Sequence, residues 1–197
     1  MVLLNLLRLY LNATSVDNTA VGSSRNETSN NLRIAGDYSS SKRLFDGSIS
    51  QLSVFDYALS ATQISTLYGS STLGAGNPMA LKRQPVGYWP LGDNSASNPL
   101  TQPNEAVEDA SVFDFDSSSS QFIDAGSASY LNGLSEFTLS CWFKLDTAAN
   151  NNTIISDWNY NSDPFGHFGL ETKNASGSTF GLRLFIKQAS DAGSNNV

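Results

Sequence analysis

Short apolar runs recur along the chain, and clusters of Ser, Asn, Gly and Asp separate them. Many of these runs alternate apolar and polar residues, and a period of two is that of a β-strand with one buried face. We expect strands at 6–11, 32–36, 45–55, 86–91, 112–115, 121–124, 137–145, 153–158, 168–170 and 180–186, with a polar loop at 12–31. So many short strands with turn-rich connections indicate an all-β sandwich or barrel.

Two strands carry more detailed signals. The alternation slips between Ile49 and Leu52, which suggests a β-bulge or a change of face. In the run 137–143 the alternation puts Cys141 on the apolar face, where it is expected as a small buried hydrophobe. It is the only cysteine, so an intrachain disulfide is excluded. Trp89 and Trp142 are expected in the core.

One segment has the signals of a helix, near 61–68. Ser60 can cap it, and Gln63 follows three residues later as in a capping box. Ile64 and Leu67 share a face, and Gly69 provides a stop. The Gly/Ser/Pro-rich stretch 70–85 is expected to be a linker, and the polar end 188–197 is expected to fray.

These motifs, taken in order, resemble a known family. Phe45-Asp46-Gly47 followed by Leu59-Ser60 is similar to the closing signature of laminin G-like domains in the concanavalin A-like lectin/glucanase superfamily. From 86 onward, Tyr88-Trp89, a Phe-Asp strand and the run 137–143 resemble the opening of such a domain. The resemblance implies an antiparallel jelly-roll β-sandwich.

The order of the two signatures is reversed, with a closing half at 1–69, a linker at 70–85 and an opening half at 86–187. The chain is then either a piece of tandem repeats or a circular permutation. We expect the halves to pack as one composite sandwich, because separate halves would each expose an apolar sheet face. One sheet is expected to lack a strand, since the family segment between Val197 and Met1 is missing from this order.

The charge of the chain excludes some partners. A formal net charge of −7 and scattered Lys and Arg argue against nucleic acid, because phosphate binding depends on clustered cations. No run reaches the roughly 18 apolar residues of a membrane helix, so membrane insertion is not expected. A surface rich in Ser, Asn and Thr is typical of extracellular modules, and we expect the protein at a cell surface or on a virion.

Catalytic constellations are not found. Sugar hydrolysis needs two carboxylates aimed at one bond, and the acidic clusters lack the spacing of related glucanases. In the first cluster (Glu105, Glu108 and Asp109), Glu105 and Glu108 are expected to be solvated loop carboxylates. Asp114 and Asp116 share a strand face at a spacing of two, but no third acid follows them. Ser-His-Asp catalysis would rest on His167 alone. The sequence therefore predicts a protein that is not an enzyme.

The candidate site is the loop 157–163. Asp157, Asn161 and Asp163 are candidate ligands of calcium, the metal that the laminin G-like resemblance implies, although ordinary turn chemistry explains the same spacing. Trp158, Asn159 and Tyr160 combine aromatic faces with an amide, which suits a sugar ring. Trp158 can instead end a core strand.

We therefore expect a non-catalytic carbohydrate-binding or adhesion module of a larger surface or phage fibre-type protein. Its partners would be a glycan or glycoprotein surface and neighbouring domains, and calcium is the one cofactor considered. Two alternatives stay open. A structural spacer without ligand would be favoured if the loop 157–163 were buried, and a glycoside hydrolase-like domain would need a cleft with paired carboxylates.

Overall fold

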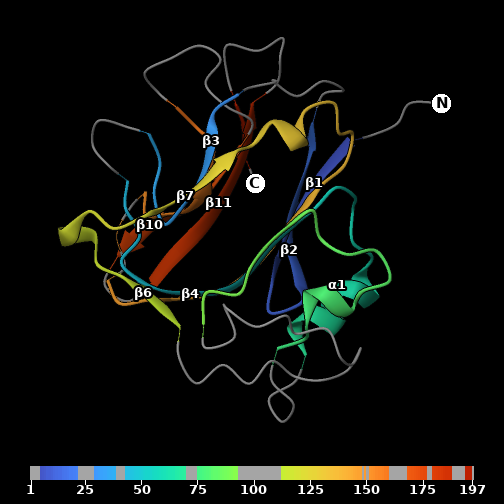
Figure 1. Ribbon diagram of the computed structural model, residues 1–197, viewed down its shortest axis with the longest axis horizontal. Helices are drawn as coiled ribbons and strands as arrows, with labels where there is room; N and C mark the ends of the chain where they lie inside the picture. Colours follow the sequence, from blue (N-terminus) through green and yellow to red (C-terminus); the bar gives the residue numbers. More distant parts are fainter. Residues whose placement is uncertain are drawn as a thin grey trace.

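A computed structural model describes residues 5–21, 29–38, 43–69, 75–92, 112–147, 149, 151–159, 168–176, 179–187 and 194–196. These residues form mostly antiparallel β-structure with one α-helix, and the strands lie in two main layers around a shared core (Figure 1). The predicted all-β sandwich is confirmed.

The larger layer is a six-stranded sheet with the order β12-β11-β10-β9-β3-β7. Its strands are β3 (Asn31–Ile34), β7 (Ile123–Ser127), β9 (Thr153–Ser156), β10 (Phe168–Ser176), β11 (Thr179–Lys187) and β12 (Ser194–Asn196). The predicted frayed end therefore contains a short strand, β12, which pairs with β11.

The second layer is built around β4 (Gly47–Phe55). Along one edge β4 pairs with β8 (Thr138–Leu145), and along the other it pairs with β5 (Gly87–Trp89) and β6 (Phe113–Phe115). The register of β4 against β8 shifts between Ser50 and Ser53, and Gln51 has a positive φ of 52°. The β-bulge predicted from the slip in alternation is confirmed.

Each of the two large sheets contains strands from distant parts of the sequence. β3 lies between β7 and β9 in the larger sheet, and β4 is flanked by strands that follow residue 86 in the smaller one. Segments 1–69 and 86–187 are therefore hydrogen-bonded to one another within each layer. In the stretch 70–85, expected as a linker, the 3₁₀ helix η1 (Pro78–Ala80) begins at Asn77, whose side chain caps it.

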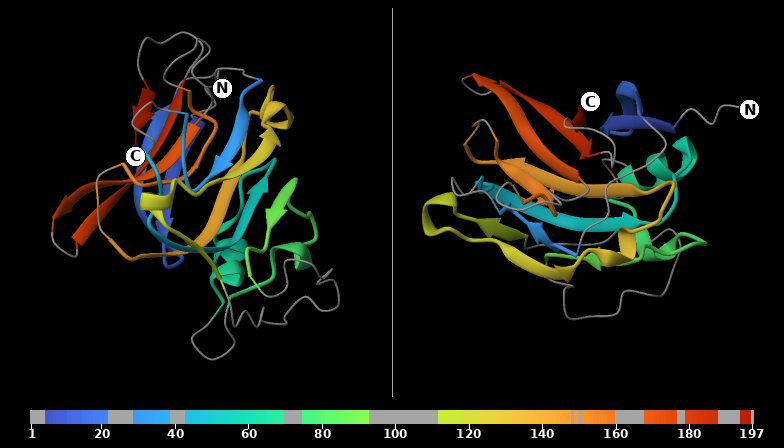
Figure 2. Two further views of the ribbon diagram at one scale, coloured as in Figure 1. Left: turned by 60° about the vertical axis from the view of Figure 1, so that its left-hand side comes forward. Right: turned by 90° about the horizontal axis from the view of Figure 1, so that it is seen from above.

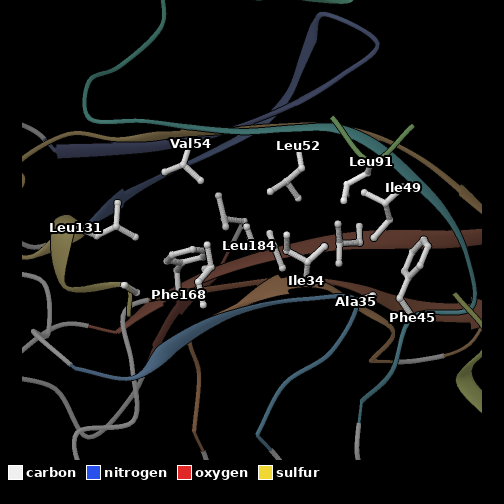
Figure 3. Close-up of a cluster of buried hydrophobic side chains, with 14 of the residues drawn as sticks. Ile34, Ala35, Phe45, Ile49, Leu52, Val54, Leu91, Leu131, Phe168 and Leu184 are labelled. Carbon is white, nitrogen blue, oxygen red and sulfur yellow. The ribbon is translucent and has the colours of Figure 1, made fainter. Parts of the chain in front are cut away.

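The core lies between the two sheets. Ile49, Leu52 and Val54 of β4 point toward Ile34 and Phe168 of the facing sheet (Figure 3). These five side chains are buried, and within β4 the bulge brings Ile49 and Leu52 onto the same face.

The two faces of β8 show that one of the two residues expected in the core, Trp142, lies outside it. Cys141 packs against the core together with the other inward residues of its strand, as expected, and burial raises the pKa of its thiol to about 12. Trp142 is exposed and stacks on Tyr68 with a centroid distance of 5.4 Å. Its expected place in the core is wrong, because the alternation that turns Cys141 inward turns its neighbour outward.

The helix α1 (Ala61–Tyr68) forms where it was predicted. Ser60 Oγ accepts from Gln63 N at 3.3 Å, while Ser60 N donates to Gln63 Oε1 at 2.9 Å, so the capping box is confirmed. Gly69 ends the helix with a φ of 69°. Within the described ranges, no helix has the length and apolar character needed to cross a membrane.

A hairpin forms a third, two-stranded sheet from β1 (Asn5–Leu11) and β2 (Thr14–Val21). β2 occupies residues that were expected as part of a polar loop, so that expectation is wrong. The strand depends on pairing with β1 and on a two-residue turn, in which Asn12 and Ala13 have φ values of 50° and 61°. Such pairs of positive φ values belong to type I′ hairpins, whose twist matches that of the strands.

Candidate functional site

The end of β9 carries the described part of the predicted site. Asp157 and Trp158 are buried, and Asn159 is partly buried. Tyr160, Asn161 and Asp163 lie outside the described residues, as does His167.

Trp158 packs as part of the protein interior. Its ring meets Phe185 edge-on with centroids 4.9 Å apart, and only 7% of the residue is exposed. Phe185 in turn lies over Gly169, where an added Cβ would come within 2.3 Å of the ring. Trp158 therefore presents little of its aromatic face to a ligand.

Asp157 is engaged inside the protein. Its Oδ1 accepts a hydrogen bond from the backbone N–H of Phe168 at 3.0 Å, and its backbone oxygen accepts from Asn30 Nδ2 at 3.2 Å. A calcium ion needs several oxygen ligands around it, and no group of three His, Cys, Asp or Glu residues gathers in the described part of the chain. The calcium set stays a prediction, since two of its three members lie outside that part.

A more exposed group lies next to this turn, on the outer face of the six-stranded sheet. The guanidinium of Arg33 lies 3.5 Å from the ring centroid of Tyr38 and 4.5 Å from that of Phe122. Arg33 Nη1 also donates to the backbone oxygen of Asp37 at 2.9 Å. Tyr38 N donates to the Trp158 backbone oxygen at 3.3 Å, which joins this group to the predicted site.

The same surface has a polar edge at Asp124, which pairs with Arg33 across β3 and β7. Asn31 Nδ2 donates to both carboxylate oxygens of Asp124 at 2.9 and 3.1 Å, and Gly126 N donates at 3.0 Å. These hydrogen bonds lower the pKa of Asp124, so the group is anionic at neutral pH. Burial raises the pKa of Tyr38, which keeps its hydroxyl protonated. We call Arg33, Tyr38, Phe122 and Asp124 the Arg33 surface.

Further along the sheet, one buried carboxylate forms ion pairs with three cationic side chains. Glu171 is 1% exposed and forms ion pairs with Arg43 Nη1 at 3.2 Å, with Lys173 Nζ at 3.6 Å and with Arg183. Asp37 adds a second anion beside Arg43, at 3.7 Å. The opposite charges attract one another, so the ion pairs of this cluster link β10 and β11 to the segment that follows β3.

Two of the candidate carboxylates, Asp114 and Asp116, are engaged in hydrogen bonds within the protein. Asp116 accepts from Ser118 Oγ and Ser119 Oγ at 2.6 Å each and from Ser118 N at 2.8 Å, which lowers its pKa to about 2. It caps the short 3₁₀ helix η3 (Ser117–Ser119), and Asp114 accepts from Ser48 Oγ at 3.2 Å. Both residues have structural roles there. The other acidic candidates, Glu105, Glu108 and Asp109, lie outside the described residues.

The sequence did not point to the Arg33 surface. The alternation Leu32-Arg33-Ile34 indicates that Arg33 faces outward, and this signal was available. Its neighbour Asp124 is 91 positions away in the chain, from 33 to 124, and only the register of β3 against β7 brings the two together.

One comparison with known proteins gives a match. Residues 5–65 match the laminin G-like family model described as the concanavalin A-like lectin/glucanases superfamily. The resemblance expected from the motifs is confirmed for this part of the chain, and it supports a lectin-like or adhesion-type module in general, from a family that is typically non-catalytic. Neither the curated proteins nor the solved structures give a match.

Proposed function

We propose that the protein is a non-catalytic carbohydrate-binding or adhesion module that holds a glycan on the Arg33 surface. The observation that carries this proposal is the Arg33 guanidinium held between Tyr38 and Phe122, with 41% of Phe122 left exposed. The ring offers an apolar face to the C–H groups of a sugar, while Arg33 and Asp124 offer a donor and an acceptor to its hydroxyl groups.

The predicted residues of the 157–163 loop have a place in this proposal. Trp158 is joined to the Arg33 surface because its backbone oxygen accepts from Tyr38 N, and the partly buried Asn159 follows it in the chain. Calcium stays the proposed cofactor of the set Asp157, Asn161 and Asp163.

The test is a glycan-array screen of the purified chain, run with calcium and with a chelator. Phe122→Ser should weaken the affinity for the best-bound glycans about fivefold, since an aromatic contact contributes about 1 kcal/mol. Phe113→Ser is the matched control, because this phenylalanine is 45% exposed but lies on β6 of the other sheet. Equal loss in both variants would contradict the location of the site, and absence of any signal from a folded chain would reject glycan binding.

A structural spacer without ligand is the second candidate, and one observation favours it. Asp157 and Trp158, which begin the predicted loop, are buried and hydrogen-bonded within the protein. A folded chain that binds no glycan, with or without calcium, would support this candidate.

A further inference from the structure

Among the strands that the structure describes, β8 has a neighbour along one of its two edges. β4 pairs along both of its edges, with β8 on one side and with β5 and β6 on the other. β8 is eight residues long and, among the strands that the structure describes, pairs with β4 alone. An edge of this length is a template for pairing with another strand.

The direction of the backbone groups on β8 can be assigned. Asp146 N donates to Asp46 O at 3.0 Å, so the residue after the end of β8 bonds toward β4. In an antiparallel ladder this direction alternates from residue to residue. The N–H and C=O groups of Ser140, Trp142 and Lys144 therefore face β4. Those that face the open edge belong to Leu139, Cys141, Phe143 and Leu145.

The same four residues turn their side chains toward the core, yet as whole residues they are only partly buried. They pack against the core but stay partly exposed, whereas Ile49, Leu52 and Val54 on the neighbouring β4 are 0%, 1% and 0% exposed. None of the described strands pairs with the backbone groups on this edge or completes the burial of these four residues. A strand placed beside β8 would satisfy both at once.

The position of the hairpin limits what can enter. Both views of Figure 2 place β1 and β2 on the side of β8 away from β4. The hairpin is hydrogen-bonded to neither large sheet, yet Leu7 of β1 belongs to the same core. A second copy of β8 would bring its own β4 with it, on the side where the hairpin lies, so the position of the hairpin favours a single extended strand as the occupant.

We propose that the open edge of β8 binds one extended strand of another polypeptide, antiparallel to β8, with apolar side chains at alternate positions turned into the core. The inward residues of that strand donate and accept backbone hydrogen bonds with Leu139, Cys141, Phe143 and Leu145. β8 carries a single charged residue, Lys144. Selection of the partner therefore rests on the apolar alternation and not on charge.

The probe is an acetylated and amidated peptide of alternating Val and Thr with Lys at each end, followed by amide hydrogen exchange in NMR. Without peptide, the amides of 139, 141, 143 and 145 should exchange much faster than those of 140, 142 and 144. With peptide, the first set should slow at least tenfold. In antiparallel pairing the inward residues turn their N–H groups toward β8. Methylation of the valine amides should therefore abolish binding, and methylation of the threonine amides should preserve it.

A pair of variants gives an independent check. Cys141→Lys puts a charge on the inward face of the edge and should abolish peptide binding, while Ser140→Lys on the outward face should retain it. The proposal would be overturned if the exchange rates of these four amides stayed unchanged at millimolar peptide concentration. It would also be overturned if the peptide with methylated threonine amides failed to bind. Protection of the same four amides without peptide at high protein concentration would also overturn it, because a second copy would then be the occupant. The methylated peptides decide the matter even if Cys141→Lys does not fold.

Discussion

At the scale of single residues, Glu171 is a carboxylate with three cationic partners on the outer face of the larger sheet. It is buried and pairs with Arg43, Lys173 and Arg183, which retain partial contact with water. Glu171→Gln keeps the shape of the side chain but removes its negative charge. Asp37 is then the remaining anion beside three cationic side chains. Removal of one partner from a buried pair is strongly destabilising, and we expect a loss of about 3 kcal/mol in the free energy of unfolding, measured by urea denaturation.

An exposed ion pair gives the control for this substitution. Lys144 Nζ lies 3.3 Å from Asp146 Oδ1, and both side chains are largely in solvent. Asp146→Asn should cost less than about 1 kcal/mol, because water and salt screen such a pair. Similar losses for the two substitutions would mean that the Glu171 cluster contributes no more than a surface contact.

At the scale of elements, the β1–β2 hairpin has an unusual residue in its turn. Ala13 adopts a φ of 61°, a region that costs an L-residue about 1–2 kcal/mol and a glycine little. Ala13→Gly removes this strain, but glycine loses more conformational entropy on folding, which offsets part of the gain. The substitution should therefore raise the free energy of unfolding by about 0.5–1 kcal/mol. Ala20→Gly, within β2, should lower it by a similar amount. Urea denaturation of both variants checks this, and a loss of stability in Ala13→Gly would contradict the assigned turn.

The elements also show what could be predicted from the sequence. The helix at 61–68 and the bulge after Ile49 depend on neighbours in the chain, and local patterns predicted both. The strand β2 could not be predicted from its own residues, because it is polar and exists through pairing with β1. The Arg33 surface depends on a register between β3 and β7, which no local pattern specifies.

At the scale of the whole molecule, the sheets are assembled from two separated segments of the chain. β3 is hydrogen-bonded to β7 and β9, and β4 to β5, β6 and β8, so each layer loses a central strand if the segments part. Each segment alone would expose an apolar sheet face, at a cost of roughly 25 cal/mol per Å². We therefore expect one cooperative unfolding transition for the whole chain.

Cleavage between the segments tests this dependence. A protease site inserted between Gly69 and Ala75 would cut the chain after α1 and before β5, between described elements of the two segments. The two fragments should elute together from a size-exclusion column under native conditions, because their strands remain paired in both sheets. After separation in denaturant, each fragment alone should lose its β-sheet circular dichroism, and mixing should restore it. Fragments that separate without denaturant and keep their sheets would show instead that each segment has a sufficient core of its own.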